Sequence, residues 1–81
     1  MTYPATAASR APVEIDADAL RAARDERQFT QAELARLCGI TPQYVSFMET
    51  RQRRYVSRAV LGDLARALRV EPDQLRPEQA A

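Results

Sequence analysis

The chain has 81 residues, of which 46% are hydrophobic, and a formal net charge of only +1. This length allows one small domain with a modest core, and no apolar run approaches the about 20 residues of a membrane-spanning helix. The single cysteine, Cys38, and the absence of histidine argue against a disulfide within the chain and against a structural zinc site. The N-terminus shows no secretory signal. We therefore expect a cytoplasmic protein without cofactor or metal.

The chain begins with a segment that shows no hydrophobic period. Residues 1–14 mix Ala, Thr, Ser and two prolines, which predicts a flexible tail outside the core. An arm that reaches around DNA is the alternative, although Arg10 is the only basic residue in this segment. The first helix is expected to start near Asp16 or Asp18 and to run to Gln28, because aspartate stabilises the positive end of a helix.

Two helix starts and one tight turn follow. Thr30 with Glu33 three residues later is the pattern of a capping box. Apolar residues at helical spacing then lead to Gly39, a usual helix stop because glycine accepts left-handed backbone. Thr41 can cap a second helix, and Pro42 suits its first position. Two short helices joined around a glycine predict a helix-turn-helix, whose second helix enters the DNA major groove.

The rest of the chain predicts a loop and two more helices. After a polar, basic loop, Ser57 can cap a helix over 58–69 with a continuous apolar face. Gly62 lies inside this helix at a cost of up to about 1 kcal/mol, which close approach of another helix would explain. A short helix at 72–76 and a frayed end at 77–81 complete the chain, and no segment alternates long enough to predict a strand.

Positive charge is concentrated around the predicted helix-turn-helix. Residues 27–58 contain six arginines and two acids, a balance of +4, whereas the remainder carries six arginines and nine acids, a balance of −3. A surface that faces phosphates requires such an asymmetry. All twelve basic residues are arginine, which we attribute mainly to codon bias.

Five short motifs occur in order along residues 20–75. They are L-R-x-x-R at 20–24, T-Q-A-E-L-A at 30–35, G-I-T at 39–41, V-S-x-M-E at 45–49 and L-A-R-A-L at 64–68. On these motifs the chain resembles the phage Cro and lambda-type repressor family of helix-turn-helix proteins, often called the XRE family. The resemblance implies an all-α, compact bundle of five helices over residues 15–76, in which the second and third helices form the motif.

The resemblance also implies roles for individual residues. Gln31 matches the start of the second helix, a position that commonly contacts a DNA phosphate, and Gln43 matches a position that contacts bases. Arg24 and Glu49 match a pair that often forms a partly buried salt bridge; two exposed charges are the alternative.

Three positions depart from the family pattern. Arg51 and Arg69 stand where the family often has glycine, and the loop from Glu49 to Ser57 is about one residue longer than usual. Phe47 occupies a position that is usually polar or basic. The path of this loop is therefore left open.

A turn of 100° per residue separates the two faces of the helix at 42–49. Val45 and Met48 fall on the inward edge. The outward residues, which we expect to contact bases, are Pro42, Gln43, Ser46 and Phe47. Phe47 can pack on a thymine methyl group; the alternatives are packing near Tyr55 or a protein contact. The residues expected to contact phosphates are Gln31, Thr41, Tyr44, Arg51, Arg53 and Arg54.

These features predict a sequence-specific regulator, most simply a small repressor, that binds double-stranded DNA as a homodimer. Leu68, Val70 and Leu75 are the candidate dimer surface, or else an ordinary lid on the core. An enzyme is not expected, because histidine, a cysteine with a base partner and a phosphate-cradling glycine loop are all absent from the sequence. The alternative is an antitoxin-like or other protein-interaction module that uses Phe47 and Tyr55.

Overall fold

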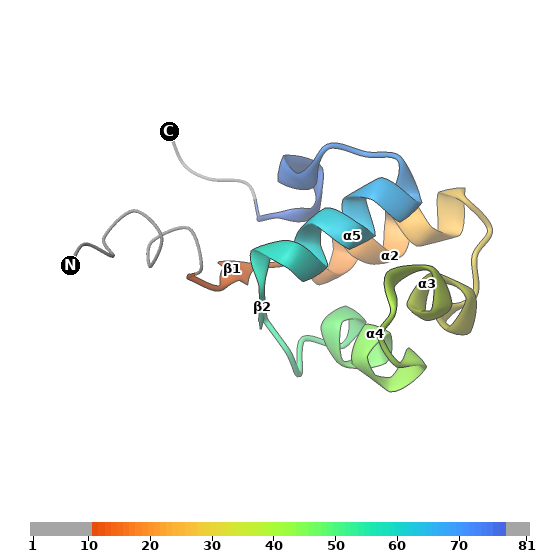
Figure 1. Cartoon of the computed structure of the whole chain (residues 1–81), viewed down its shortest axis with the longest axis horizontal. Helices are drawn as coiled ribbons and strands as arrows, with labels where there is room; N and C mark the ends of the chain where they lie inside the picture. The colour runs from red at the N-terminus through yellow and green to blue at the C-terminus, as the bar shows by residue number, and fades with distance from the viewer. Residues whose placement is uncertain (1–10, 78–81) are drawn as a thin grey trace.

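The structure is a computed structural model that describes residues 11–77. In chain order its elements are β1 (Val13–Glu14), α2 (Ala17–Glu26), α3 (Gln31–Cys38), α4 (Pro42–Glu49), β2 (Tyr55–Val56), α5 (Arg58–Leu68) and the 3-10 helix η1 (Pro72–Leu75). Figure 1 shows α3 and α4 next to each other, with the two strands beyond the far end of α4. Within residues 11–77, no helix is long and apolar enough to cross a bilayer.

The expectation of five α-helices and no strand is wrong. The described part of the chain has four α-helices, and the predicted fifth is the single 3-10 turn η1, which starts at Pro72 and ends before Pro77. The two short strands pair antiparallel, with Val13 opposite Val56 and Glu14 opposite Tyr55. Strands of two residues carry too few positions for an alternating pattern to be visible in the sequence.

The four α-helices begin at the side-chain caps that the sequence predicts. Asp16 accepts hydrogen bonds from the backbone N–H groups of the first turn of α2, and Thr41 and Ser57 do the same for α4 and α5. Thr30 and Glu33 form the expected capping box, with both reciprocal bonds present. Local hydrogen bonding thus sets these boundaries.

Left-handed backbone follows each of the four α-helices of the described residues, at Gln28, Gly39, Arg51 and Arg69. Gly39 ends α3 at a φ of 69°, as expected for a glycine stop. Helix α2 ends at Glu26, two residues earlier than predicted, because the chain turns at Gln28 with a φ of 59°.

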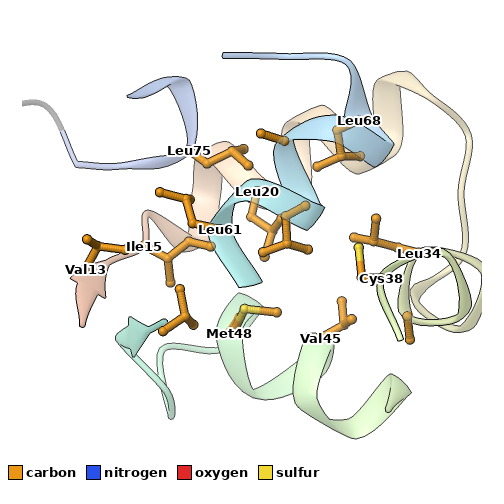
Figure 2. Close-up of a cluster of buried hydrophobic side chains, with 14 residues drawn as sticks. Val13, Ile15, Leu20, Leu34, Cys38, Val45, Met48, Leu61, Leu68 and Leu75 are labelled. Carbon is orange, nitrogen blue, oxygen red and sulfur yellow. The ribbon is translucent and has the colours of Figure 1, made fainter. Parts of the chain in front are cut away.

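The core contains side chains from every element (Figure 2). Its fully buried large side chains are Leu20, Leu34, Val45, Met48, Leu64, Leu68 and Leu75. Val13 and Ile15 fill one end of the cluster, and Leu34 and Cys38 the other (Figure 2). The prediction that the chain before residue 15 adds nothing to the core is therefore wrong for Val13, which is 3% exposed. The rest of the predicted tail up to residue 10, and residues 78–81, lie outside the described part.

Two of the three candidate dimer residues belong to this core. Leu68 and Leu75 are each 1% exposed, which suits the alternative of a core lid, although Leu75 also lines a surface hollow with Val70. Val70 is partly exposed and packs against the same cluster. The backbone carbonyl of Leu75 accepts a hydrogen bond of 2.8 Å from the N–H of Asp16, which fixes η1 against the start of α2.

Close approach of another helix does not explain Gly62. A Cβ placed on this residue meets no atom within 4 Å apart from its own helix and neighbours. The conformational cost of glycine in α5 is thus not offset by tighter packing, and the structure offers no other reason for this residue.

Candidate nucleic-acid interface

Helix α4 has a buried face and an exposed face. Val45 and Met48 are fully buried against the core. At the front of the helix Pro42 and Gln43 are exposed, next to the cap Thr41. Further along, the remaining two base-contact candidates, Ser46 and Phe47, are only partly exposed. The amide of Gln43 is therefore the most accessible group on this helix that can both donate and accept hydrogen bonds.

A buried carboxylate fixes the last turn of α4. Glu49 accepts two hydrogen bonds from Arg24 of α2, 2.6 Å from Nε to Oε2 and 2.9 Å from Nη2 to Oε1. The Arg24 side chain is 12% exposed and that of Glu49 only 1%. Nη1 of Arg24 also donates to the carbonyl of Phe29, at 2.8 Å. This pair ties α2, the chain before α3 and the end of α4 together.

Gln31 joins the same network. Its Nε2 donates to Oε1 of Glu49 at 3.1 Å, a contact that the sequence does not predict, since the family resemblance implies only a phosphate contact for Gln31. The amide has a second N–H, so this contact leaves Gln31 able to donate a hydrogen bond to a phosphate oxygen as well. The two partners are 18 residues apart in the chain, so no local sequence pattern predicts this hydrogen bond.

Both charged groups of the network are stabilised in their ionised forms. Burial raises the pKa of Glu49, but the hydrogen bonds from Arg24 and Gln31, helped by the charges of Arg24 and Arg21, outweigh it and hold this pKa below its ordinary value. The pKa of Arg24 is raised, chiefly by its hydrogen bond to Glu49. The pair is therefore fully charged at neutral pH.

The segment after α4 turns back sharply. The backbone N–H groups of Gln52 and Arg53 donate to the carbonyl of Phe47, at 2.9 and 3.0 Å. This turn requires left-handed backbone at Arg51, with a φ of 66°, at one of the positions where the sequence departs from glycine. The Ile15 N–H then donates to the Arg54 carbonyl at 2.8 Å. The path of the loop between α4 and β2, which the sequence leaves open, is thus fixed at its C-terminal end by the pairing of β1 with β2.

The three arginines of this segment have different partners. Arg51 forms an exposed ion pair with Asp18 in the first turn of α2, with 2.8 Å from Nη2 to Oδ2. The guanidinium of Arg53 lies over the ring of Tyr44, 5.0 Å from its centre. Among residues 11–77 the ion pairs involve neither Arg53 nor Arg54, and both are exposed, so these two charges are available to phosphates.

A shallow hollow brings five of the candidate residues together. It has a volume of about 170 Å³ and is lined by Thr41, Gln43, Tyr44, Phe47 and Arg53. Base-contact and phosphate-contact candidates therefore share one surface at the front of α4. The other candidates, Pro42, Ser46, Gln31, Arg51 and Arg54, are not part of its lining. Tyr55 lies outside it too, with 55% of its surface exposed, so the structure places Phe47 in the hollow with Arg53.

The described residues offer no metal site. No group of three or more His, Cys, Asp or Glu side chains within residues 11–77 is arranged to hold a metal ion. Cys38 is buried, and burial raises the pKa of its thiol. It is therefore a small apolar side chain of the core, not a reactive thiolate.

Residues 20–75 match the sequence profile of the helix-turn-helix family HTH_3. The chain belongs to this family, the Cro and lambda-type helix-turn-helix proteins. No curated protein matches its sequence. Among solved structures, this helix-turn-helix domain is similar to the P22 c2 repressor in complex with the synthetic operator 9T, at 25% identity and a TM-score of 0.71. That similarity covers 78% of this chain and 94% of the repressor chain.

Two further structures show the range of proteins that contain this domain. The restriction-modification controller protein C.AhdI from Aeromonas hydrophila is 36% identical, with a TM-score of 0.67, over 72% of this chain and 86% of that one. The cobalt(II) form of HppE in complex with its substrate is 28% identical, with a TM-score of 0.73, over 79% of this chain. This second match covers only 35% of the HppE chain.

Proposed function

We propose that this helix-turn-helix domain binds double-stranded DNA in a sequence-specific manner and acts as a small transcriptional repressor. The observation that carries the proposal is the surface at the front of α4, where exposed Gln43 lies beside Arg53 and both line one hollow. A polar side chain that can specify a base is thus placed next to a cation that can bind the adjacent phosphate. The similarity to a repressor solved with its operator supports this placement.

The contacts to bases follow from the chemistry of the exposed face. The Gln43 amide can donate to N7 of adenine and accept from its N6 amino group. Phe47 lines the same hollow and offers an apolar surface to the methyl group of a neighbouring thymine. Pro42 is exposed beside Gln43, and the Ser46 hydroxyl can bond to a base or a phosphate.

The arginines expected to contact phosphates differ in whether they already form an ion pair within the domain. Arg53 and Arg54 are not engaged in ion pairs within residues 11–77 and supply most of the neutralising charge. Arg51 must first leave Asp18. The side chains of Thr41 and Tyr44 flank the hollow as neutral donors.

A homodimer extends the site, because one such module contacts only a few base pairs. Half-sites one helical turn apart, about 34 Å, would then be bound by two copies of α4. Of the three dimer candidates Val70 retains the most exposed surface. Together with Leu75 it belongs to a hollow between α2 and η1, whose other lining residues are Ala19, Ala22, Ala23, Asp25, Glu26 and Gln74. We place the contact between copies there.

The experiment is a salt titration of binding to a duplex selected from random DNA and to an unrelated duplex. For wild type, the logarithm of the association constant should fall linearly with the logarithm of salt concentration. Arg53→Ala and Arg54→Ala should each weaken binding to both duplexes and lower the slope by about one. Arg36→Ala removes an exposed arginine near the C-terminal end of α3 and should leave the slope unchanged.

Gln43→Ala should instead reduce the preference for one base pair of the selected duplex by about 1–3 kcal/mol. An equal loss on both duplexes would refute the role of Gln43. Absence of binding to any duplex at low salt would refute the proposed function. That result would favour the second candidate, a protein-interaction module with Phe47 and Tyr55 as anchors, which is supported by the exposure of Tyr55.

A further inference from the structure

A larger hollow lies on a different face of the domain, where the end of α2, the end of α3 and the second half of α5 meet. Its volume is about 510 Å³, and we call it the Leu37 hollow after its most exposed apolar residue. Phe29, Leu37 and Ala67 provide its apolar lining, and Arg27, Arg66 and Arg69 provide guanidinium groups. It has no lining residue in common with the hollow at the front of α4.

Leu37 is unusual among the leucines of the described chain. It is 57% exposed, whereas Leu34 on the same helix is fully buried. A single exposed leucine is ordinary on a protein surface. Here, however, it shares a concave surface with the partly buried ring of Phe29 and with Ala67. These three residues form the apolar part of the hollow, beside the charged residues of its lining.

The charges around this pocket are mostly positive. The one acid in the lining, Asp63, pairs with Arg66 at 2.6 Å, which leaves an excess of two arginines. Arg27 is held in place because its Nε donates to the Leu68 carbonyl at the end of α5, at 3.1 Å. Its terminal N–H groups have no hydrogen-bond partner among the residues that the structure describes. Guanidinium groups around an apolar pocket complement carboxylates that flank an apolar side chain.

Arg69 adds an independent observation. It ends α5 in left-handed backbone, with φ 59° and ψ 45°, a conformation that glycine adopts without strain. Within residues 11–77 its side chain takes part in no ion pair or hydrogen bond. Strained residues are often retained where they contact a ligand. Arg69 lines the Leu37 hollow, and its side chain has no polar partner within residues 11–77.

From these observations we infer that the Leu37 hollow binds an acidic protein segment that inserts an apolar side chain between Phe29, Leu37 and Ala67. Carboxylates of the segment pair with Arg27 and Arg69, the two arginines of the lining that Asp63 does not pair with. A nucleic-acid backbone is the poorer match, because it offers the arginines a charge but no apolar group to bury against Phe29, Leu37 and Ala67. This face and the front of α4 share no lining residue.

The probe for this inference is a displayed library of random 12-residue peptides, selected on the purified full chain. The recovered peptides should be rich in Asp and Glu and carry Leu, Ile, Phe or Met. Leu37→Glu should weaken their binding at least tenfold, because it places a carboxylate in the pocket. Ala59→Glu adds the same charge at an exposed position of α5 outside the hollow and should leave peptide binding unchanged.

A second variant separates binding from folding. Arg69→Gly removes the guanidinium and relieves the strained backbone, so it should weaken peptide binding several-fold while raising the melting temperature. Its matched control is Arg51→Gly. Arg51 also has left-handed backbone and follows α4, but it lies outside the Leu37 hollow, so this variant should leave peptide binding unchanged. Any duplex binding that wild type shows should be the same for Arg69→Gly. Peptide binding is measured without DNA, so its outcome does not depend on the proposed function.

Three results would overturn the inference. The first is a selection without enrichment in acidic residues. The second is peptide binding that Leu37→Glu or Arg69→Gly leaves as in wild type. The third is loss of duplex binding with Arg69→Gly, which would assign this arginine to a nucleic-acid surface instead.

Discussion

Arg24 and Glu49 are 25 residues apart in the chain and form a two-bond ion pair between α2 and α4, with distances of 2.6 and 2.9 Å. The carboxylate is almost completely buried and accepts a third hydrogen bond from Gln31 at the start of α3. The orientation of α4 relative to the other helices of the motif thus depends on one charged group. The proposed DNA contacts depend on the same group, because α4 carries them.

Arg24→Ala is expected to destabilise the domain by about 3–5 kcal/mol, because it leaves the Glu49 carboxylate buried without its cation. Urea unfolding followed by circular dichroism measures this change. The control is Arg66→Ala, which breaks an exposed pair within α5 and should change the free energy of unfolding by less than about 1 kcal/mol. A loss below about 1 kcal/mol for Arg24→Ala would show that the pair is not buried in solution.

The same pair predicts a dependence of stability on pH. In the folded domain the pKa of Glu49 lies below its ordinary value of 4.5. Its contribution to stability is therefore complete above about pH 4.5, and it is lost as the pH falls through the folded pKa. The difference in unfolding free energy between wild type and Glu49→Gln should be constant from about pH 7 to 5 and shrink below about pH 4.5.

Glu33 is a second carboxylate whose titration makes the stability of the domain depend on pH, and its contribution must be distinguished from that of Glu49. The backbone N–H of Thr30, with its side chain, lowers the pKa of Glu33 as well, so acid also weakens the capping box. Glu33→Gln keeps a hydrogen-bonding group at this position and removes the titration. In the Glu33→Gln background, the acid-dependent effect of adding Glu49→Gln should persist; its disappearance would assign the effect to Glu33.

The parts of the fold that the sequence predicts are those set by neighbouring residues. Thr30, Gly39, Thr41 and Ser57 act within four residues of their own positions, so composition and spacing suffice to place them. The exposed position of Gln43 follows from helical periodicity in the same way.

What the sequence does not predict depends on residues far apart in the chain. Val13 reaches the core only because its strand pairs with Val56, and a two-residue strand has no pattern of its own. The bond from Gln31 to Glu49 and the ion pair of Arg51 with Asp18 likewise join separate elements. Apolar residues near the C-terminus suit either a lid or an interface, and only the packed structure distinguishes the two.

Gly62→Ala is expected to stabilise the domain by about 0.5–1 kcal/mol. The added methyl group meets no atom within 4 Å outside its own helix and neighbours, and alanine loses less conformational freedom than glycine in a helix. Gly39→Ala is the contrasting variant. It also has space around it, but its φ of 69° should make alanine destabilising by about 1–2 kcal/mol. The denaturant midpoint should rise for Gly62→Ala and fall for Gly39→Ala. A shift in the same direction for both variants would contradict these two predictions.

Asp18→Asn is expected to tighten DNA binding. Asp18 holds the guanidinium of Arg51 at 2.8 Å, although both side chains are more than half exposed, so the pair contributes only about 0.2–1 kcal/mol. Removing the carboxylate frees this arginine for a phosphate and should raise the affinity for any duplex by up to about fivefold. The salt slope should stay the same or steepen, since no cation is lost.

Arg51 provides the control, because the effect of Asp18→Asn requires this guanidinium. In an Arg51→Gly background, Asp18→Asn should raise the duplex affinity only slightly. The small increase that remains comes from removing one negative charge near the DNA. Asp63→Asn breaks another exposed ion pair, within α5 at the Leu37 hollow, and should leave duplex affinity unchanged. A gain from Asp18→Asn that is equally large without Arg51 would show that the arginine does not contact phosphate.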